Sequence, residues 1–116
     1  MTALVAYKVL TAAQFAALQA NQFAGAPVDV ADGYIHLSTA AQLTGTVQKH
    51  FAGQEGLVVA AVDLARLGEA LRWEVSRGGA LFPHVYGRLR MGDVVAHAPL
   101  CWRDGLVVLP DQHAPP

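Results

Sequence analysis

Hydrophobic residues along the chain follow two different periods, which predicts strands alternating with helices. Unbroken apolar runs indicate buried strands, whereas a strict alternation of apolar with polar residues indicates strands with one exposed face. By these criteria the strands cover residues 4–10, 34–38, 56–62, 71–76 and 84–90, followed by a terminal hairpin of 94–102 and 106–109.

Two helices are predicted in the first half of the chain, and both begin with the same tetrapeptide. Thr-Ala-Ala-Gln occurs at residues 11–14 and again at 39–42. It is a capping box, in which the threonine hydroxyl and the glutamine amide satisfy N–H groups at the start of a helix. The helices are expected to reach about residues 20 and 51, although Gly45 weakens the second by about 1 kcal/mol relative to alanine.

The order of these elements favours an α+β fold. Helices grouped early in the chain do not supply the repeated crossovers of a parallel sheet. Residues 21–33 are rich in Gly, Pro, Asn and Asp and predict a long loop. A single domain is expected over residues 1–109, with a flexible tail at 110–116. The absence of a glycine-rich dinucleotide motif argues against a Rossmann protein.

Composition narrows the class of protein further. Of the 116 residues, 53 % are hydrophobic and 15 % charged, which argues against disorder, and the net charge of −1 does not favour nucleic acid. No apolar stretch approaches the roughly 20 residues of a membrane helix, and no secretory signal is recognised, so a cytoplasmic protein is expected. The single Cys101 excludes a cysteine-based zinc site, and a His36/His84 pair lacks a third ligand, so no metal is expected.

Reactive side chains occupy alternate positions of two predicted strands. Because successive side chains of a strand point to opposite faces, Tyr34, His36 and Ser38 share one face, while Ile35 and Leu37 point into the core. An imidazole with a hydroxyl two residues later suits a ligand that carries hydroxyl or phosphate groups.

The second strand carries its polar side chains in the same way. His84, Tyr86, Arg88 and Arg90 share one face, provided that no bulge at Gly87 breaks the register. If the two strands are neighbours, their polar faces line one cleft for anion binding or acid–base catalysis. His84 equally suits an edge strand that emerges from a turn.

Arginines are concentrated in the same part of the chain. Residues 66–90 hold five arginines against two acids, an excess that suits a phosphate or, equally, a solvated surface.

Three of the polar residues each fit a second interpretation. His36 fits a buried histidine bonded to a backbone carbonyl, and Ser38 fits a helix cap. Glu74 is either a carboxyl with a raised pKa in apolar surroundings or an exposed partner of Arg72 or Arg77.

Four motifs together give the chain a family resemblance. They are Tyr7-Lys8-Val9-Leu10, Asp32-Gly33-Tyr34-Ile35-His36-Leu37-Ser38, Leu71-Arg72-Trp73-Glu74 and Leu81-Phe82-Pro83-His84-Val85-Tyr86-Gly87. Over residues 4–100 the chain resembles the bacterial family catalogued as domain of unknown function 952. That family is grouped with the ADP-ribosyltransferase-like fold, which implies a small split or bent, mostly antiparallel sheet that holds NAD in a cleft.

The resemblance also implies roles for individual residues. His36 and Ser38 are similar to a histidine and hydroxyl pair that contacts the nicotinamide-side ribose. Glu74 precedes Tyr86, whereas many ADP-ribosyltransferases have the glutamate after the tyrosine. The set of Lys8, His36 and His84 looks like the branch that resembles RNA 2′-phosphotransferases, with Lys8 in place of an arginine.

Two functions are compatible with these features. In the first, the protein binds NAD or an ADP-ribose-type ligand and acts as an ADP-ribosyltransferase-like transferase on a protein acceptor. Its expected catalytic residues are His36, His84 and Glu74. Its expected ligand-binding residues are Lys8, Tyr34, Ser38, Arg72, Arg77, Tyr86 and Arg88, with an arginine on the pyrophosphate and Tyr86 stacked on a ring. In the second, the protein is a non-enzymatic binding or protein-interaction module.

Overall fold

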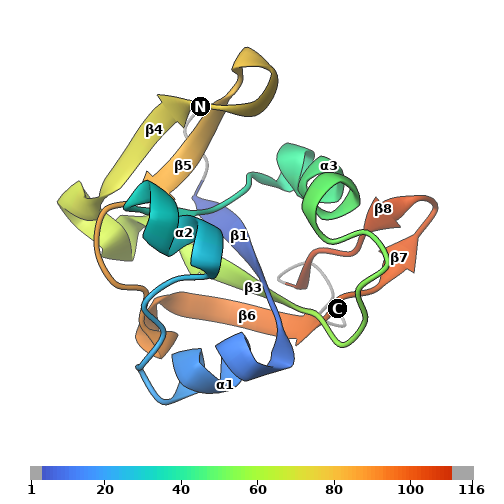
Figure 1. Cartoon of the computed structure of the whole chain (residues 1–116), viewed down its shortest axis with the longest axis horizontal. Helices are drawn as coiled ribbons and strands as arrows, with labels where there is room; N and C mark the ends of the chain where they lie inside the picture. The colour runs from blue at the N-terminus through green and yellow to red at the C-terminus, as the bar shows by residue number, and fades with distance from the viewer. Residues whose placement is uncertain (1–3, 111–116) are drawn as a thin grey trace.

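Two three-stranded antiparallel sheets form the framework of residues 4–110, the part of the chain that the computed structural model describes (Figure 1). The first sheet, in the order β1-β3-β6, contains β1 (Val5–Leu10), β3 (Val58–Asp63) and β6 (Val94–Pro99). The second, in the order β2-β5-β4, contains β2 (Ile35–His36), β5 (Leu81–Val85) and β4 (Leu71–Val75). The predicted α+β class is confirmed.

Within the described residues 4–110, the two sheets are joined by one isolated bridge. Tyr7 of β1 donates its N–H to the Ser38 carbonyl at 2.7 Å, and the Ser38 N–H donates back to the Tyr7 carbonyl at 2.9 Å. The bridge follows directly after β2, so a few residues carry the chain from one sheet to the other. A short junction of this kind leaves room for a cleft between the sheets.

Both predicted capping boxes start helices as expected. Thr11 caps α1 (Ala12–Gln19) and Thr39 caps α3 (Ala40–His50). In each box the threonine hydroxyl accepts the N–H of the glutamine, and the glutamine side chain accepts the N–H of the threonine. Short 3₁₀ segments follow later in the chain: η1 (Leu64–Ala70), η2 (Arg77–Gly79) and η3 (Met91–Asp93).

The long loop predicted at residues 21–33 is wrong, because it contains the helix α2 (Pro27–Asp32). Pro27 occupies the first turn, where its missing N–H costs nothing. The Asp29 carboxylate reaches back to accept the Ala26 N–H at 2.8 Å. Gly33, with φ of 87°, ends the helix in the left-handed region. Pro, Asp and Gly thus act here as start and stop signals of a helix.

The strand predicted at residues 84–90 is also wrong in its extent. β5 covers Leu81–Val85, and the chain then bends away. The Tyr86 N–H donates to the Ala70 carbonyl at 2.7 Å, outside the ladder of β4 and β5. Leu89 is 1 % exposed and joins the core, which pulls the following segment out of the sheet. Of the polar face expected beyond His84, Tyr86 still shares the Glu74 carboxylate with His84, but the strand does not continue to Arg88 and Arg90.

The C-terminal strands pair differently from the predicted hairpin. β6 pairs with the central strand β3, and the hairpin is confined to β7 (Trp102–Arg103) and β8 (Leu106–Val107). Of the predicted tail, only Pro110 belongs to the described residues; 111–116 lie outside them. No helix within residues 4–110 has the length and apolar character needed to cross a membrane.

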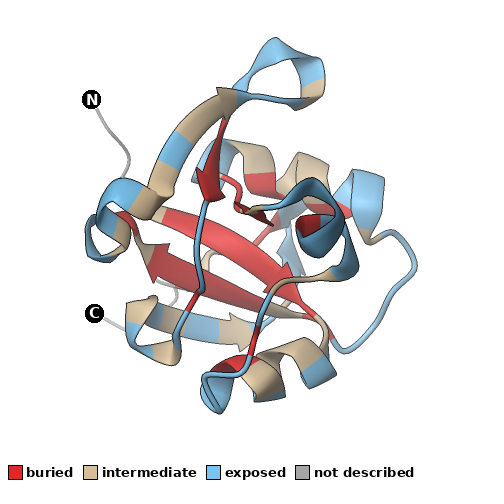
Figure 2. Cartoon of the chain, turned by 60° about the vertical axis from the view of Figure 1, so that its left-hand side comes forward, coloured by how far each residue is buried: buried red, intermediate tan, exposed pale blue. Residues whose placement is uncertain are grey.

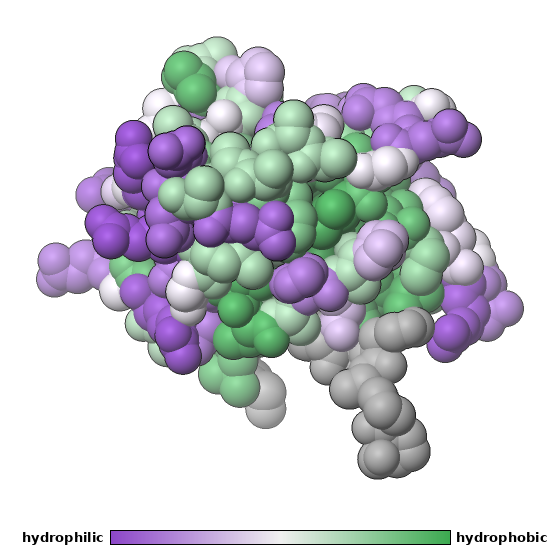
Figure 3. Space-filling view, turned by 90° about the horizontal axis from the view of Figure 1, so that it is seen from below, coloured by the Kyte–Doolittle hydropathy of each residue, from purple (hydrophilic) through white to green (hydrophobic). Residues whose placement is uncertain are grey.

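Hydrophobic side chains pack against both faces of β3, whose neighbourhood is the most deeply buried part of the molecule (Figure 2). Ala60 and Val62 join the cluster that contains Leu18 of α1, and Val59 and Ala61 join the cluster that contains Leu43 of α3. The face seen from below in Figure 3 shows hydrophobic residues across its middle and hydrophilic residues along both sides. Both faces of β3 are thus covered by hydrophobic side chains.

Candidate functional site

The strands that carry the two predicted motifs are neighbours. β2 pairs with β5, and His36 lies directly opposite His84 in the register. Ile35 and Val85 form the adjacent pair and point into the core, where they are 2 % and 0 % exposed. Because the side chains alternate, the two imidazoles share the opposite face, as predicted.

A cleft of about 640 Å³ opens on that face, between α2, α3 and the junction of the sheets. Five of the predicted site residues line it: Lys8, His36, Ser38, Arg77 and His84. The other five lie outside its lining: Tyr34, Arg72, Glu74, Tyr86 and Arg88. The structure therefore brings half of the expected residues together in the cleft. Of the others, Tyr34 and Glu74 contact His84, and Tyr86 contacts Glu74.

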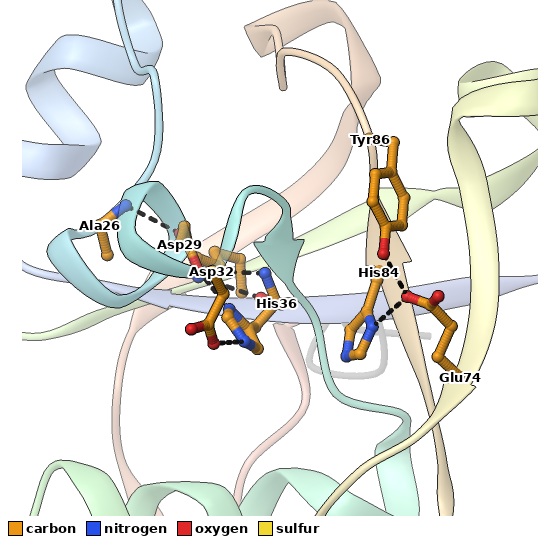
Figure 4. A network of polar contacts seen from close by, with 8 residues as sticks. Ala26, Asp29, Asp32, His36, Glu74, His84 and Tyr86 are labelled. Atoms are coloured by element: carbon orange, nitrogen blue, oxygen red, sulfur yellow. Dashed lines mark hydrogen bonds and ion pairs between the residues drawn. The ribbon is translucent and has the colours of Figure 1, made fainter.

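A buried carboxylate from α2 organises one side of the cleft (Figure 4). Asp29, which is 2 % exposed, lies 2.9 Å from Lys8 Nζ and accepts hydrogen bonds from the Ala26 and His36 backbone N–H groups. Its Oδ1 is also 2.7 Å from His36 Nδ1. Lys8 Nζ donates in addition to the His36 carbonyl at 3.0 Å. One carboxylate thus joins β1, α2 and β2.

The electrostatics of this group follow from its burial. Burial alone raises the pKa of Asp29, but the hydrogen bonds from His36 and the charge of Lys8 outweigh it and bring the pKa to about 2. Burial lowers the pKa of Lys8, and the charge and hydrogen bond of Asp29 oppose that shift. Lys8 is thus mainly a structural partner of Asp29 although it borders the cleft.

The His36 ring is held at both nitrogens by carboxylates. Besides Asp29 at Nδ1, Asp32 Oδ2 lies 3.0 Å from His36 Nε2. The interpretation of His36 as a histidine bonded to a backbone carbonyl is therefore wrong for this ring. Within residues 4–110, no group of three His, Cys, Asp or Glu side chains is arranged to hold a metal ion.

A second carboxylate holds His84 from the other side. Glu74 Oε1 lies 2.7 Å from His84 Nδ1 and accepts the Tyr86 hydroxyl at 2.8 Å (Figure 4). The expectation that Glu74 pairs with Arg72 or Arg77 is wrong, because its register neighbour on β5 is Phe82 and His84 lies diagonally across. These hydrogen bonds lower the pKa of Glu74, contrary to the raised pKa considered from sequence.

Aromatic stacking links the two histidines to the tyrosines. The Tyr34 ring stacks on His84 with centroids 4.1 Å apart and an interplanar angle of 27°. The centroid of the Tyr34 ring also lies 4.7 Å from that of the His36 ring and 5.2 Å from that of the Tyr86 ring. Tyr34 thus packs against the rings that border the cleft, and Tyr86 acts through Glu74.

Arg77 provides a cation on the α3 side of the cleft. Its guanidinium donates to Thr46 Oγ1 at 3.2 Å and lies over the Phe82 ring, 5.0 Å from the centroid. Gly45 permits this approach, since a Cβ there would lie 3.3 Å from Arg77 Nη2. The Ser38 hydroxyl bonds Thr46 Oγ1 at 2.8 Å, so its predicted role as a helix cap is wrong.

The two remaining arginines lie away from the cleft. Arg72 stacks over the Tyr86 ring, 4.9 Å from its centroid, on the face of β4 that also carries Glu74. Arg88 is exposed beyond the end of β5. Neither is placed to share a ligand phosphate with Arg77 in the cleft.

Sequence reasoning missed Asp29 and Asp32, which both belong to α2. The signal was present: Ala26-Pro27 followed by an acid at the third helical position and by Gly33 is typical of a short helix. Phe51 and Phe82 also line the cleft. Nothing local marks these two side chains, because their exposure to the cleft depends on how α3 and β5 meet.

Comparison with known proteins places this architecture in context. Residues 9–97 match the family model described as protein of unknown function (DUF952). The X-ray crystal structure of protein CC0527 from Caulobacter crescentus is 45 % identical, with a TM-score of 0.82 over 93 % of this chain and 96 % of that chain. The solution NMR structure of CC0527 is 44 % identical, with a TM-score of 0.76 over 90 % and 91 %. No curated protein matches the chain.

Proposed function

Since the chain belongs to the DUF952 family of proteins of unknown function, we propose a function from its cleft: it binds a small nucleotide-type ligand, NAD or an ADP-ribose-type molecule. The observation that carries the proposal is His84 Nε2. This nitrogen is buried, has no hydrogen-bond partner within the described residues, and belongs to a side chain that lines the cleft with Arg77. A buried polar atom without a partner costs about 1–3 kcal/mol, which a ligand hydroxyl recovers by bonding it.

Arg77 supports binding of the phosphate groups. A guanidinium has five N–H donors in a planar fork that matches phosphate oxygens. Within residues 4–110, contacts to Thr46 Oγ1 and to the Gln42 carbonyl account for two of them. The stacking on Phe82 holds the plane of the fork, so binding of a phosphate to the remaining donors orders the side chain at little entropic cost.

The rest of the lining supports binding of rings. Phe51, Phe82, Pro27 and Val28 contribute apolar surface, while Ser38 and Thr46 contribute hydroxyls. A volume of about 640 Å³ falls within the range of roughly 300–1,000 Å³ that holds small-molecule ligands. A mainly apolar cleft with a few polar groups suits a nucleoside attached to phosphate. His84 and Arg77 then determine its orientation.

Thermal shift and calorimetry with NAD and ADP-ribose test this proposal. Ligand at 100 times its dissociation constant is expected to stabilise the fold by about 2.7 kcal/mol. Arg77→Gln is expected to weaken binding at least tenfold. Arg88→Gln, which removes an exposed arginine outside the cleft, is the matched control and leaves binding unchanged. If neither ligand stabilises the wild-type protein, the nucleotide proposal is wrong and the non-enzymatic module is favoured.

A further inference from the structure

The two nitrogens of the His84 ring have opposite surroundings. Nδ1 lies 2.7 Å from Glu74 Oε1, whereas Nε2 has no hydrogen-bond partner within residues 4–110. The His84 side chain is 2 % exposed, so solvent does not reach the ring freely. The residue is nevertheless part of the lining of the cleft. Because His84 is one of the residues that line the cleft, a molecule bound there would lie against this residue.

The Glu74 carboxylate determines which nitrogen carries the proton. An ionised carboxylate accepts hydrogen bonds and cannot donate them. The hydrogen bonds from His84 and Tyr86 lower the pKa of Glu74, so the group is ionised at neutral pH. Nδ1 must therefore be the donor in the 2.7 Å contact. In the neutral ring the lone pair then lies on Nε2, the nitrogen that has no hydrogen-bond partner within residues 4–110.

The ring is also fixed in position. β5 is the central strand of its sheet, paired with β2 on one side and β4 on the other. Tyr34 stacks on the ring, and Tyr86 holds the Glu74 carboxylate at 2.8 Å through its hydroxyl. An imidazole held by neighbours on a paired strand keeps one orientation, which is the requirement for a catalytic base.

We propose that His84 is a general base, whose Nε2 accepts the proton of a hydroxyl group in the cleft, with Glu74 and Tyr86 as positioning residues that set its tautomer. The inference rests on the proposed function for the identity of the ligand, a phosphorylated sugar with free hydroxyls. In the step, the O–H bond breaks, its electron pair stays on oxygen, and the proton bonds to the Nε2 lone pair. The imidazolium that forms is stabilised by Glu74, as an oriented carboxylate does for other catalytic histidines.

The arrangement of the second histidine supports this assignment. His36 has both ring nitrogens within 3.0 Å of carboxylate oxygens, so neither offers a lone pair to a ligand. The two facing rings therefore differ in their surroundings: both His36 nitrogens lie beside carboxylate oxygens, whereas His84 Nε2 has no hydrogen-bond partner within residues 4–110. If the Glu74–His84 pair served only to stabilise the fold, nothing would require His84 Nε2 to lack a hydrogen-bond partner.

Nitrogen-15 NMR of the His84 ring tests the tautomer without any ligand. In the wild-type protein, at a pH where the ring is neutral, Nδ1 is expected to carry the proton and Nε2 to be unprotonated. Glu74→Gln is expected to lower the population of that tautomer, because an amide can donate to Nδ1 as well as accept from it. A proton on Nε2 in the wild type, or an unchanged tautomer in Glu74→Gln, overturns the inference.

Ligand titrations test the contact itself. ADP-ribose is expected to shift the His84 Nε2 resonance, and His84→Phe, which keeps an aromatic ring beside Tyr34, to weaken binding at least tenfold. His97→Phe is the matched control, since His97 contacts the Phe15 ring outside the cleft lining, and the affinity of this variant stays at the wild-type level. If the tautomer is as expected but NAD and ADP-ribose do not bind, the proposed function fails and the tautomer assignment stands. If ADP-ribose binds but the His84 Nε2 resonance does not shift, the proposal that His84 is a general base is overturned.

Discussion

His36 and His84 face each other across the β2–β5 pair, with ring centroids 5.3 Å apart and an edge-to-face angle of 69°. Each ring is held at Nδ1 by a carboxylate from a different element, Asp29 from α2 and Glu74 from β4. Each carboxylate thus belongs to a different element from its histidine, with His36 on β2 and His84 on β5. The positions of the two rings therefore depend on contacts between separate elements of the fold.

Asp29→Asn is expected to destabilise the fold by about 3 kcal/mol, because it leaves the buried Lys8 ammonium without its countercharge. The free energy of unfolding in urea measures the loss. The double variant Lys8→Met, Asp29→Asn is expected to lose less than the single variant, since no uncompensated charge remains. A double variant as unstable as the sum of the two single variants contradicts this account.

Acid is expected to remove the contribution of Asp29 between about pH 4 and pH 2. The pKa of the carboxyl is about 2 in the folded protein and 3.8 when unperturbed, so its stabilisation is present above pH 4 and is lost as the pH falls through the folded value. The size is about 2 kcal/mol. Unfolding of the wild type and of Asp29→Asn, compared at several pH values, should show their difference shrink in this window. A constant difference contradicts the prediction.

Gly25 and Gly33 flank α2 and are expected to respond differently to alanine. Both have positive φ, 123° and 87°. At Gly33 a Cβ meets nothing within 4 Å, so Gly33→Ala costs only backbone strain of about 1–2 kcal/mol. At Gly25 the Cβ would lie 2.9 Å from Asp29 Cβ. Gly25→Ala is therefore expected to cost more and to shift the His36 resonances. Equal losses of unfolding free energy contradict this.

A double-mutant cycle tests the close packing of Arg77 on α3. Gly45→Ala is expected to stabilise the Arg77→Ala background by about 1 kcal/mol through helix propensity. In the wild-type background the gain is expected to be smaller, because the new Cβ would approach Arg77 Nη2 to 3.3 Å and move the guanidinium. Thermal denaturation of the four proteins gives the coupling. An equal gain in both backgrounds would show that the contact does not constrain Arg77.

Parts of the site could be predicted from sequence because they depend on neighbours along the chain. The alternation around His36 correctly placed Ile35 and Leu37 in the core, where each is 2 % exposed. The same argument failed beyond Val85, because burial of Leu89 competes with extension of β5. The alternation of apolar and polar residues indicates that a segment can form a strand. It does not show whether burial of a residue such as Leu89 in the core is more favourable than extending that strand.

The carboxylates that hold the two histidines could not be predicted from the alternation of residues along a strand. Asp29 was assigned to a loop, and Glu74 was paired with the wrong cations, since both assignments used only residues close in sequence. The contacts that matter join Lys8 to Asp29 and Glu74 to His84, across separate elements. A carboxylate such as Glu74 has several possible hydrogen-bond donors nearby in the sequence. The fold decides which of them comes within about 3 Å and forms the bond.

By itself the sequence determined the capping boxes, the alternation of β2 and the family, because helix starts and strand parity are set by hydrogen bonds and sterics within a few residues. Only the tertiary structure decided that His36 lies opposite His84, that Asp29 and Glu74 hold them, and that Nε2 of His84 has no hydrogen-bond partner within residues 4–110. Those contacts form only when the two sheets and α2 pack together. Their strength depends on distances and burial that this packing sets, which the local sequence does not determine.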